Sequence, residues 1–230
     1  MTRPGTDPAP GAGGRRRTNG LIAPEGIPFV LGAAAAAAAL YFILPGRIAP
    51  AVFGLLLAAF MAWFFRDPER MPPSHPGAVI SPADGRIVFS GDCPPGRYSP
   101  DPGKMVSVFM SVFDVHVNRA PVSGKVIAVL YNKGKFLAAN VDKASLENEQ
   151  NGVVLETAEG GRVSYVQIAG LIARRIVCDL SVGDAVKQGQ RVGMIRFGSR
   201  VDVFLPASAS LRVRTGDRVR AGESVLGVLQ

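Results

Sequence analysis

The sequence GDAVKQGQRV at residues 183–192 returns near the C-terminus as GDRVRAGESV at residues 216–225. A fainter pair is PADGRI at residues 82–87 and PVSGKV at residues 121–126. Each copy places a glycine-containing turn beside a short run of strand-forming residues, and repetition of such a unit is informative about architecture. These repeats predict a flattened barrel or sandwich of β-hairpins.

The chain from residue 78 onward fits this prediction, because short strand-like runs are separated by glycines and prolines and convincing helical patterns are few. The fainter repeat resembles the turn-and-strand pattern of biotinyl and lipoyl carrier domains. We therefore expect a mainly β domain over residues 67–230 that resembles biotinyl/lipoyl-type domains.

Two apolar stretches precede this domain. Residues 1–20 are rich in Gly, Pro, Thr and Arg, so we expect a disordered basic tail there. Residues 27–44 and 48–65 carry no charge, and as helices rising about 1.5 Å per residue each is just long enough to cross the hydrocarbon layer. They predict a two-helix transmembrane hairpin within residues 21–66. A cleaved signal peptide is less favoured because a second apolar stretch follows, and a buried helical pair because large apolar side chains lie on all faces.

The charge balance also indicates a membrane. The chain has 26 Lys and Arg against 18 Asp and Glu, a formal charge of +8, which favours an anionic membrane surface over nucleic acid, for which no motif appears. Arginines lie in the N-terminal tail and at Arg66 and Arg70, whereas the turn between the spans offers only Arg47. Both chain ends are therefore predicted to face the cytoplasm at the inner membrane. No metal site is predicted, because Cys93 and Cys178 lack metal-type spacing and only two histidines occur.

The segment RFGSR at residues 196–200 lies between two strand-like runs, residues 191–197 and 201–205. We expect a hairpin with Gly198 and Ser199 at its bend, because glycine adopts backbone conformations that other residues avoid. A hydroxyl at Ser199 would then lie within reach of the carbonyl group of Gly198. A Gly-Ser pair is by itself a weak functional signal.

Phe197-Gly198-Ser199 resembles the processing site of the phosphatidylserine decarboxylases. Three further segments resemble that family in the same order, namely SPADG at residues 81–85, DVHVNRAP at residues 114–121 and ARRIVC at residues 173–178. On these four ordered segments the chain is identified as a member of the family in its short, membrane-anchored bacterial form.

The resemblance implies a proenzyme that cuts itself between Gly198 and Ser199 into residues 1–198 and 199–230, which remain associated. It implies that Ser199 attacks the Gly198 carbonyl and that the resulting ester eliminates, which leaves a covalent pyruvoyl cofactor derived from Ser199. The mature enzyme would convert phosphatidylserine to phosphatidylethanolamine and CO2 in phospholipid biosynthesis. Homo-oligomerisation is left open.

Two further residues gain a role from the resemblance. By residue type alone, His116 at the end of an apolar run is more often structural, and Asp84 in a turn is more often a turn residue. The resemblance instead makes His116 the base that activates Ser199 and Asp84 the carboxylate partner of that base.

The chain departs from the family pattern at one position. Many members resemble His-x-x-His where this chain has His116 and then Arg119, so whether His116 serves both self-cleavage and decarboxylation stays open. Arg174 and Arg175 lie in a family-like segment, where they either pair with the lipid phosphate or are solvated strand-edge charges.

The sequence allows three alternative functions. A serine hydrolase elbow requires glycine where Phe197 and Val201 stand, which disfavours that class. A membrane-tethered biotinyl- or lipoyl-like carrier or adaptor without catalysis would stay in one piece, so an intact mass discriminates it. A pyruvoyl decarboxylase of another amine substrate is the third, and the apolar spans favour a lipid instead.

Overall fold

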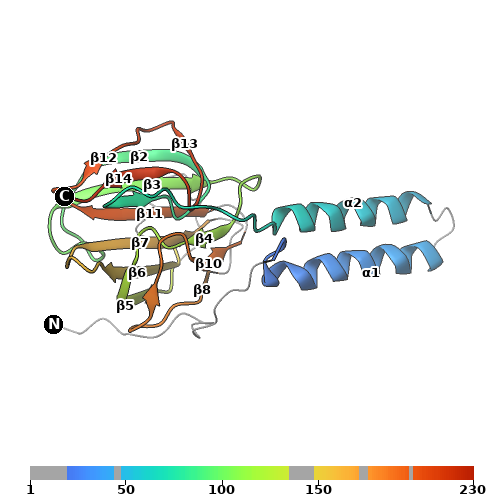
Figure 1. The fold of residues 1–230 in the computed structure, drawn as a ribbon. Coiled ribbons are helices and arrows are strands. Elements are labelled where there is room, and N and C mark those ends of the chain that lie inside the picture. Colours follow the sequence, from blue (N-terminus) through green and yellow to red (C-terminus); the bar gives the residue numbers. More distant parts are fainter. Residues whose placement is uncertain (1–19, 44–47, 135–147, 171–175, 197–198) are drawn as a thin grey trace. The chain divides into compact units, whose positions relative to one another are not determined.

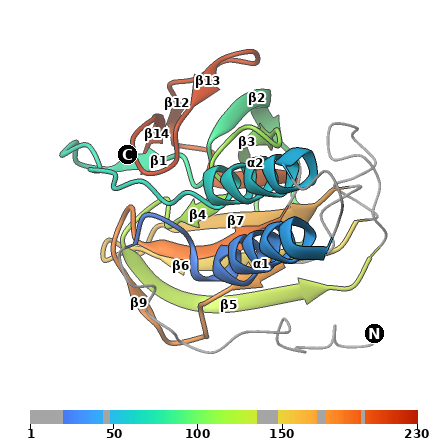
Figure 2. The ribbon, with the colours of Figure 1, turned by 90° about the vertical axis from the view of Figure 1, so that its right-hand side faces the viewer.

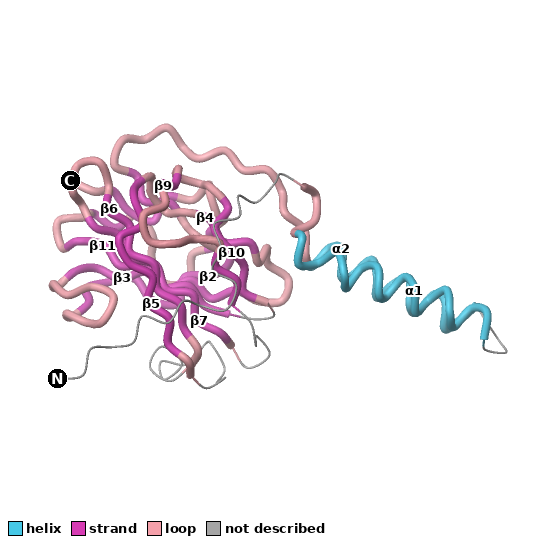
Figure 3. The backbone as a smooth tube through the Cα atoms, turned by 90° about the horizontal axis from the view of Figure 1, so that it is seen from below, coloured by secondary structure: helices cyan, strands magenta, loops and turns pink. Residues whose placement is uncertain are grey.

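A computed structural model describes residues 20–43, 48–134, 148–170, 176–196 and 199–230 of the chain. The described residues form two compact units, a helical unit that ends at Glu69 and a β-domain that begins at Arg70. In the described part of the chain, the helices lie in the first unit and the strands in the second (Figure 3).

The helical unit is an antiparallel pair of apolar helices. A short 3-10 turn η1 (Pro24–Gly26) leads into α1 (Ile27–Ile43), and α2 (Ile48–Phe64) returns beside it (Figure 1). A Cβ atom on Gly54 of α2 would lie 2.5 Å from the Cβ of Ala37 in α1, so glycine is what permits this close approach.

These helices occupy the expected apolar stretches to within one residue at the C-terminal end of each. Residues 24–43 form a helix long and apolar enough to span a membrane, and α2 is equally apolar but 17 residues long. Large apolar side chains are exposed on both helices, including Phe42 and Phe53 at 75% and 69%. Exposed apolar surface of this extent is typical of a region that contacts a membrane or another protein.

The β-domain is built from antiparallel strands in three sheets. The large sheet has the order β13-β2-β3-β11-β7-β6-β5-β9 and curls (Figure 2), and the two smaller sheets are β1-β14-β12 and β4-β10-β8. The strands are β1 (Ala78–Ile80), β2 (Gly85–Cys93), β3 (Gly103–Met110), β4 (Val117–Arg119), β5 (Gly124–Asn132), β6 (Gln150–Glu156), β7 (Arg162–Ala169), β8 (Ile176–Cys178), β9 (Ala185–Val186), β10 (Arg191–Ile195), β11 (Ser199–Pro206), β12 (Ser210–Leu211), β13 (Arg218–Val219) and β14 (Val225–Val228).

The sequence repeat is a structural repeat. Strand β9 pairs with the start of β5, and β13 pairs in the same manner with the start of β2. The turns before them are residues 181–184 and 214–217, and their third residues, Gly183 and Gly216, have φ angles of 100° and 99°. Glycine adopts this left-handed conformation without a steric penalty, so the same local sequence forms the same turn twice. The prediction of a mainly β domain preceded by helices is confirmed, and its large sheet curls as a half-barrel.

The core lies between the sheets and is made mostly of aliphatic side chains. On β11, Val201, Val203 and Leu205 point into it, and residues 200, 202 and 204 point to the opposite face because strand side chains alternate. Ser199 has the same parity as Val201, so its side chain lies on the core face.

The predicted hairpin around residues 191–205 is wrong. Strand β10 pairs with β4 and β8, whereas β11 pairs with β3 and β7, so the two strands belong to different sheets. Ser199 is the first residue of β11 and not part of a bend between paired strands. Each strand finds its neighbours far away in the sequence, which a local turn signal does not reveal.

Candidate functional site

Ser199 is held from both sides by the backbone of the large sheet. It pairs with Met110 at the end of β3 and with Ala169 at the end of β7, and it is fully buried. Its hydroxyl lies 3.3 Å from the Sδ atom of Met110, to which it donates. A thioether is a weak acceptor, so this contact orients the hydroxyl and leaves its oxygen lone pairs to react.

His116 lies beside the segment that leads to Ser199. It precedes β4, and its carbonyl oxygen accepts a hydrogen bond from the backbone N–H of Ile195 at 3.4 Å. The next residue, Val117, pairs with Met194 of β10. Because Ile195 comes only a few residues before Ser199, the antiparallel pairing of β4 and β10 brings the predicted base to the predicted nucleophile's segment. The His116 side chain is fully buried.

Asp84 lies in the turn before β2, and that turn packs against β4. The carbonyl oxygen of Pro82 accepts hydrogen bonds from the backbone N–H of Arg119 at 2.9 Å and from Nδ2 of Asn118 at 3.4 Å. The segments that resemble the family at residues 81–85 and 114–121 are therefore neighbours in space.

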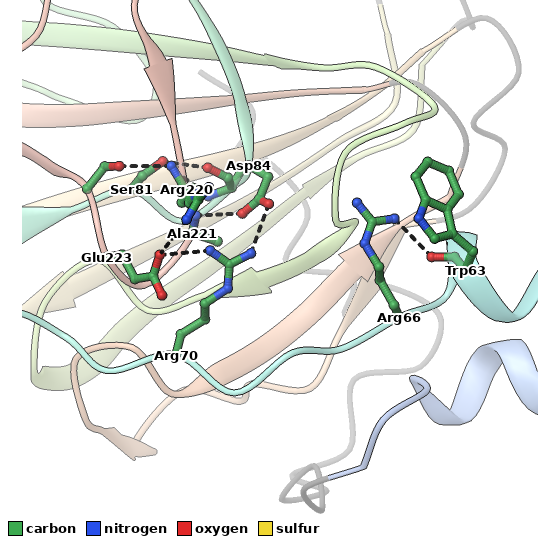
Figure 4. A network of polar contacts seen from close by, with 10 residues as sticks. Trp63, Arg66, Arg70, Ser81, Asp84, Arg220, Ala221 and Glu223 are labelled. Carbon is green, nitrogen blue, oxygen red and sulfur yellow. Dashed lines mark hydrogen bonds and ion pairs between the residues drawn. The ribbon is translucent and has the colours of Figure 1, made fainter.

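The Asp84 carboxylate is bound at both oxygens. Oδ1 accepts the backbone N–H of Ala221 at 2.7 Å, and Oδ2 accepts Nη2 of Arg70 at 3.1 Å (Figure 4). Burial raises the pKa of Asp84 above its ordinary value, and the hydrogen bond from Ala221 and the Arg70 guanidinium oppose that rise. The proposed role of Asp84 as partner of His116 stays a prediction.

Near Met110, the residue that contacts the Ser199 hydroxyl, three buried amide side chains are linked by hydrogen bonds. Sequence analysis did not identify them. Asn118 approaches the Sδ of Met110 with Nδ2 at 3.9 Å, and its Oδ1 accepts Nε2 of Gln167 at 2.9 Å. Oε1 of Gln167 in turn accepts Nδ2 of Asn151 at 3.1 Å. All three amide side chains are fully buried, so they tie β4, β7 and β6 together beneath Met110. Gln167 within the otherwise apolar end of β7 was the available signal.

Gly198, Arg174 and Arg175 lie outside the described residues, so their proposed roles stay predictions. A cavity of about 350 Å³ lies on the face of the large sheet opposite to the Ser199 side chain, with Asp202 and Phe204 of β11 among its lining residues. It is therefore separate from the site around Ser199.

The sequence model of the phosphatidylserine decarboxylase family matches residues 57–227, a range that includes the segments at residues 81–85, 114–121, 173–178 and 197–199. The chain belongs to the phosphatidylserine decarboxylase family. A phosphatidylserine decarboxylase proenzyme of Geobacter metallireducens is 48% identical over 217 residues, which cover 93% of this chain and 99% of the relative. Proenzymes of the same name from Citrifermentans bemidjiense and Magnetococcus marinus are 49% and 44% identical, over 93% and 92% of this chain and 99% and 97% of theirs.

The family assignment made from four short segments is thus confirmed, and the chain is an enzyme of this family. The carrier or adaptor alternative is not favoured, because the match to phosphatidylserine decarboxylases spans nearly the whole chain.

The residues that follow Ser199 form a buried ion pair that anchors its strand. Nε of Arg200 donates to Oδ1 of Asp202 at 2.6 Å, and Nη2 donates to Oγ of Ser107 on β3 at 2.9 Å. The two charged side chains are 5% and 3% exposed. Burial raises the pKa of Asp202, and Arg200 and Ser107 oppose that rise.

Asp202→Ala is expected to lower the free energy of unfolding by about 3–5 kcal/mol, because it leaves the Arg200 guanidinium buried without its carboxylate. The matched control is Glu156→Ala, which removes the exposed pair with Arg162, where the side chains are 41% and 63% exposed. That change should cost less than about 1 kcal/mol. Denaturant unfolding of both variants in a Ser199→Ala background keeps the chain in one piece. Equal losses in the two variants would contradict the assignment of the Arg200 pair as an anchor.

Proposed function

We propose that this chain is a proenzyme that cleaves itself between Gly198 and Ser199 and then decarboxylates phosphatidylserine to phosphatidylethanolamine. The observation that carries the proposal is the place of Ser199: a serine at the start of a central strand, beside the segment of His116, in a chain of the phosphatidylserine decarboxylase family. Relatives of nearly equal length are named proenzymes, which supports self-processing.

Self-cleavage would use the chain's own groups. The Ser199 oxygen attacks the carbonyl carbon of Gly198, the peptide C–N bond breaks, and an ester with a free amino group at residue 199 results. His116 accepts the hydroxyl proton and returns it to the departing nitrogen. Removal of the Cα proton of residue 199 then expels the Gly198 carboxylate, and water replaces the amino group as ammonia, which leaves a ketone.

The residues around position 199 fit a covalent pyruvoyl group. The backbone beyond it is fixed by pairing to β3 and β7, and the position faces the buried core side with the Met110 thioether against it. A pyruvoyl group there supplies a ketone that condenses with the substrate amine and withdraws electrons as CO2 departs. Residue 199 is fully buried in the uncut chain, and the same burial in the cut enzyme would keep bulk water from the reacting carbon.

The two pieces would stay together after cleavage because their strands are interleaved. Residues 199–230 contain β11, which pairs with β3 and β7, as well as β13 and β14, which pair with β2 and β1. Removing them would expose unpaired strand edges and the buried Val201, Val203 and Leu205.

The helical unit would anchor the enzyme in the inner membrane with both chain ends in the cytoplasm. The exposed apolar surface of α1 and α2 and the arginines that flank the pair support this orientation.

A cysteine introduced at exposed Thr215, in a background without the two native cysteines, is expected to resist a membrane-impermeant thiol reagent in intact cells and to react after lysis. Labelling in intact cells would overturn the orientation.

The activity is tested with purified enzyme and vesicles that contain phosphatidylserine. We expect phosphatidylethanolamine and CO2 in equal amounts, and much less CO2 from free serine, which lacks the lipid. CO2 from free serine at the same rate would favour a small amine substrate. No CO2 from either, with an intact fold, would contradict the proposed function.

A further inference from the structure

Arg70 joins two acidic side chains that are far apart in the sequence. Its Nη2 donates to Oδ2 of Asp84 at 3.1 Å, and its Nη1 donates to Oε2 of Glu223 at 3.0 Å (Figure 4). The Arg70 and Asp84 side chains are 11% and 12% exposed, so water screens their interaction little. Shielded, hydrogen-bonded ion pairs are stronger than exposed pairs and costly to break from one side.

The structural repeat shows which part of this arrangement the turn itself requires. In the other copy, Ser123 occupies the place of Asp84, and its Oγ accepts the backbone N–H of Gln188 at 2.9 Å. This bond corresponds to the one between Oδ1 of Asp84 and the N–H of Ala221 at 2.7 Å. A serine hydroxyl is thus sufficient to form the turn, and the second carboxylate oxygen of Asp84 is not needed for it.

Glu223, the other acid that Arg70 binds, also corresponds to an uncharged residue in the other copy. The place of Glu223 is taken in the other copy by Gln190, whose Oε1 accepts the backbone N–H of Lys187 at 3.0 Å. Both acids that Arg70 binds therefore correspond to uncharged residues in a turn of equal geometry. At these two positions the acids occur in only one copy, and in that copy Pro82 accepts hydrogen bonds from Asn118 and Arg119 of β4, the strand that follows His116.

We propose that Arg70 is a positioning residue for self-processing, which holds the Asp84 carboxylate in one orientation and fastens it to Glu223. The inference rests on the proposed function, because it assigns Asp84 to the reaction at Ser199. Arg70 and Asp84 belong to residues 1–198, and Glu223 and Ala221 belong to residues 199–230. The contacts therefore also cross from one expected piece to the other.

An arginine suits this position for a geometric reason. The guanidinium is planar and presents separate N–H groups in fixed directions, so one side chain binds two carboxylates at once and keeps them apart. A lysine ammonium keeps the charge but lacks this planar fork. Gly222, with φ of 79°, leaves room for the arrangement, because a Cβ atom there would lie 3.2 Å from the Cβ of Arg70.

The guanidinium also favours the ionised form of Asp84. Its positive charge lowers the pKa of a carboxylate that burial raises, so its removal raises that pKa further. A reaction that needs ionised Asp84 then begins only at higher pH, and the acid limb of its pH profile moves upward. Among the described residues, the charged side chains near Asp84 and Glu223 include Asp114, Arg119 and Arg220 besides Arg70.

The test measures conversion of freshly synthesised full-length chains into two pieces, between pH 5 and 9, in the presence of phospholipid vesicles. We expect Arg70→Gln to be slower than wild type at pH 6 by about tenfold, with its acid limb about one pH unit higher. Arg70→Lys should shift the limb in the same direction by less. The matched control is Arg220→Gln, because Arg220 also approaches Glu223, at 4.0 Å, yet is 75% exposed, and it should match wild type.

The outcomes separate this inference from the function on which it rests. If wild type is not cut at all, the proposed function fails. If wild type is cut and Arg70→Gln shows the same rate and pH profile, Arg70 has no positioning role. If the melting curve shows that Arg70→Gln does not fold, the test rests on Arg70→Lys. A pH profile of self-cleavage in Arg70→Lys identical to that of wild type would contradict the inference. A melting temperature lowered equally in Arg70→Lys and Glu223→Gln, with no shift of the acid limb in either variant, would show a purely structural tie.

Discussion

Ser199→Ala is expected to leave the chain in one piece and without decarboxylase activity. Alanine has no oxygen to attack the Gly198 carbonyl, so neither the ester nor the ketone at residue 199 forms. The substitution should leave the fold intact, because the backbone pairing of residue 199 with Met110 and Ala169 remains. Gel electrophoresis of the denatured chain and release of CO2 from phosphatidylserine vesicles measure the two effects.

Two companion variants sharpen this result. Ser199→Cys is expected to be cut slowly, because a thiol can make the same acyl shift. Ser208→Ala removes an exposed hydroxyl from the same C-terminal segment and should be cut and active like wild type. Cleavage of Ser199→Ala at the same bond would show that the Ser199 hydroxyl is not the nucleophile.

His116→Ala is expected to slow self-cleavage by about 10²–10⁴-fold, the usual contribution of a positioned general base. The chain should accumulate uncut while its fold persists, which a time course on denaturing gels and a melting curve would show. The other histidine of the chain, His75, is exposed, and its ring Nδ1 lies 2.8 Å from the carbonyl oxygen of Pro76, so His75→Ala is the matched control and should mature normally.

A folded His116→Ala chain that matures at the wild-type rate would remove His116 from self-cleavage. If the His116→Ala chain matures but then releases CO2 more slowly than wild type, His116 acts in decarboxylation instead. The variant thus also addresses the question of whether His116 serves both self-cleavage and decarboxylation.

The architecture was predictable where it depends on local backbone chemistry. Gly183 and Gly216 take nearly equal positive φ angles, so the repeated sequence marks a repeated turn before any tertiary contact is known. The partners of β10 and β11 were not predictable in this manner. Their neighbours, including β3 and β4, come from distant parts of the chain, and a local Gly-Ser signal suggested a hairpin that does not exist.

The candidate site shows the same division. Ser199, His116 and Asp84 were singled out from short segments, and the fold brings those segments together through β4. Arg70 was counted in the sequence only as a positive charge after the second apolar stretch. Its contacts with Asp84 and Glu223 exist only in the folded domain, so no spacing in the sequence indicated them.

The most direct measurement is the intact mass of the purified wild-type chain under denaturing conditions. The account predicts two masses, for residues 1–198 and 199–230, with the smaller piece lacking a free amino group at its first residue because a ketone has replaced it. Borohydride reduction in the presence of phosphatidylserine should attach the lipid to that smaller piece. A single full-length mass from fully active enzyme, with an ordinary serine at position 199, would contradict the account.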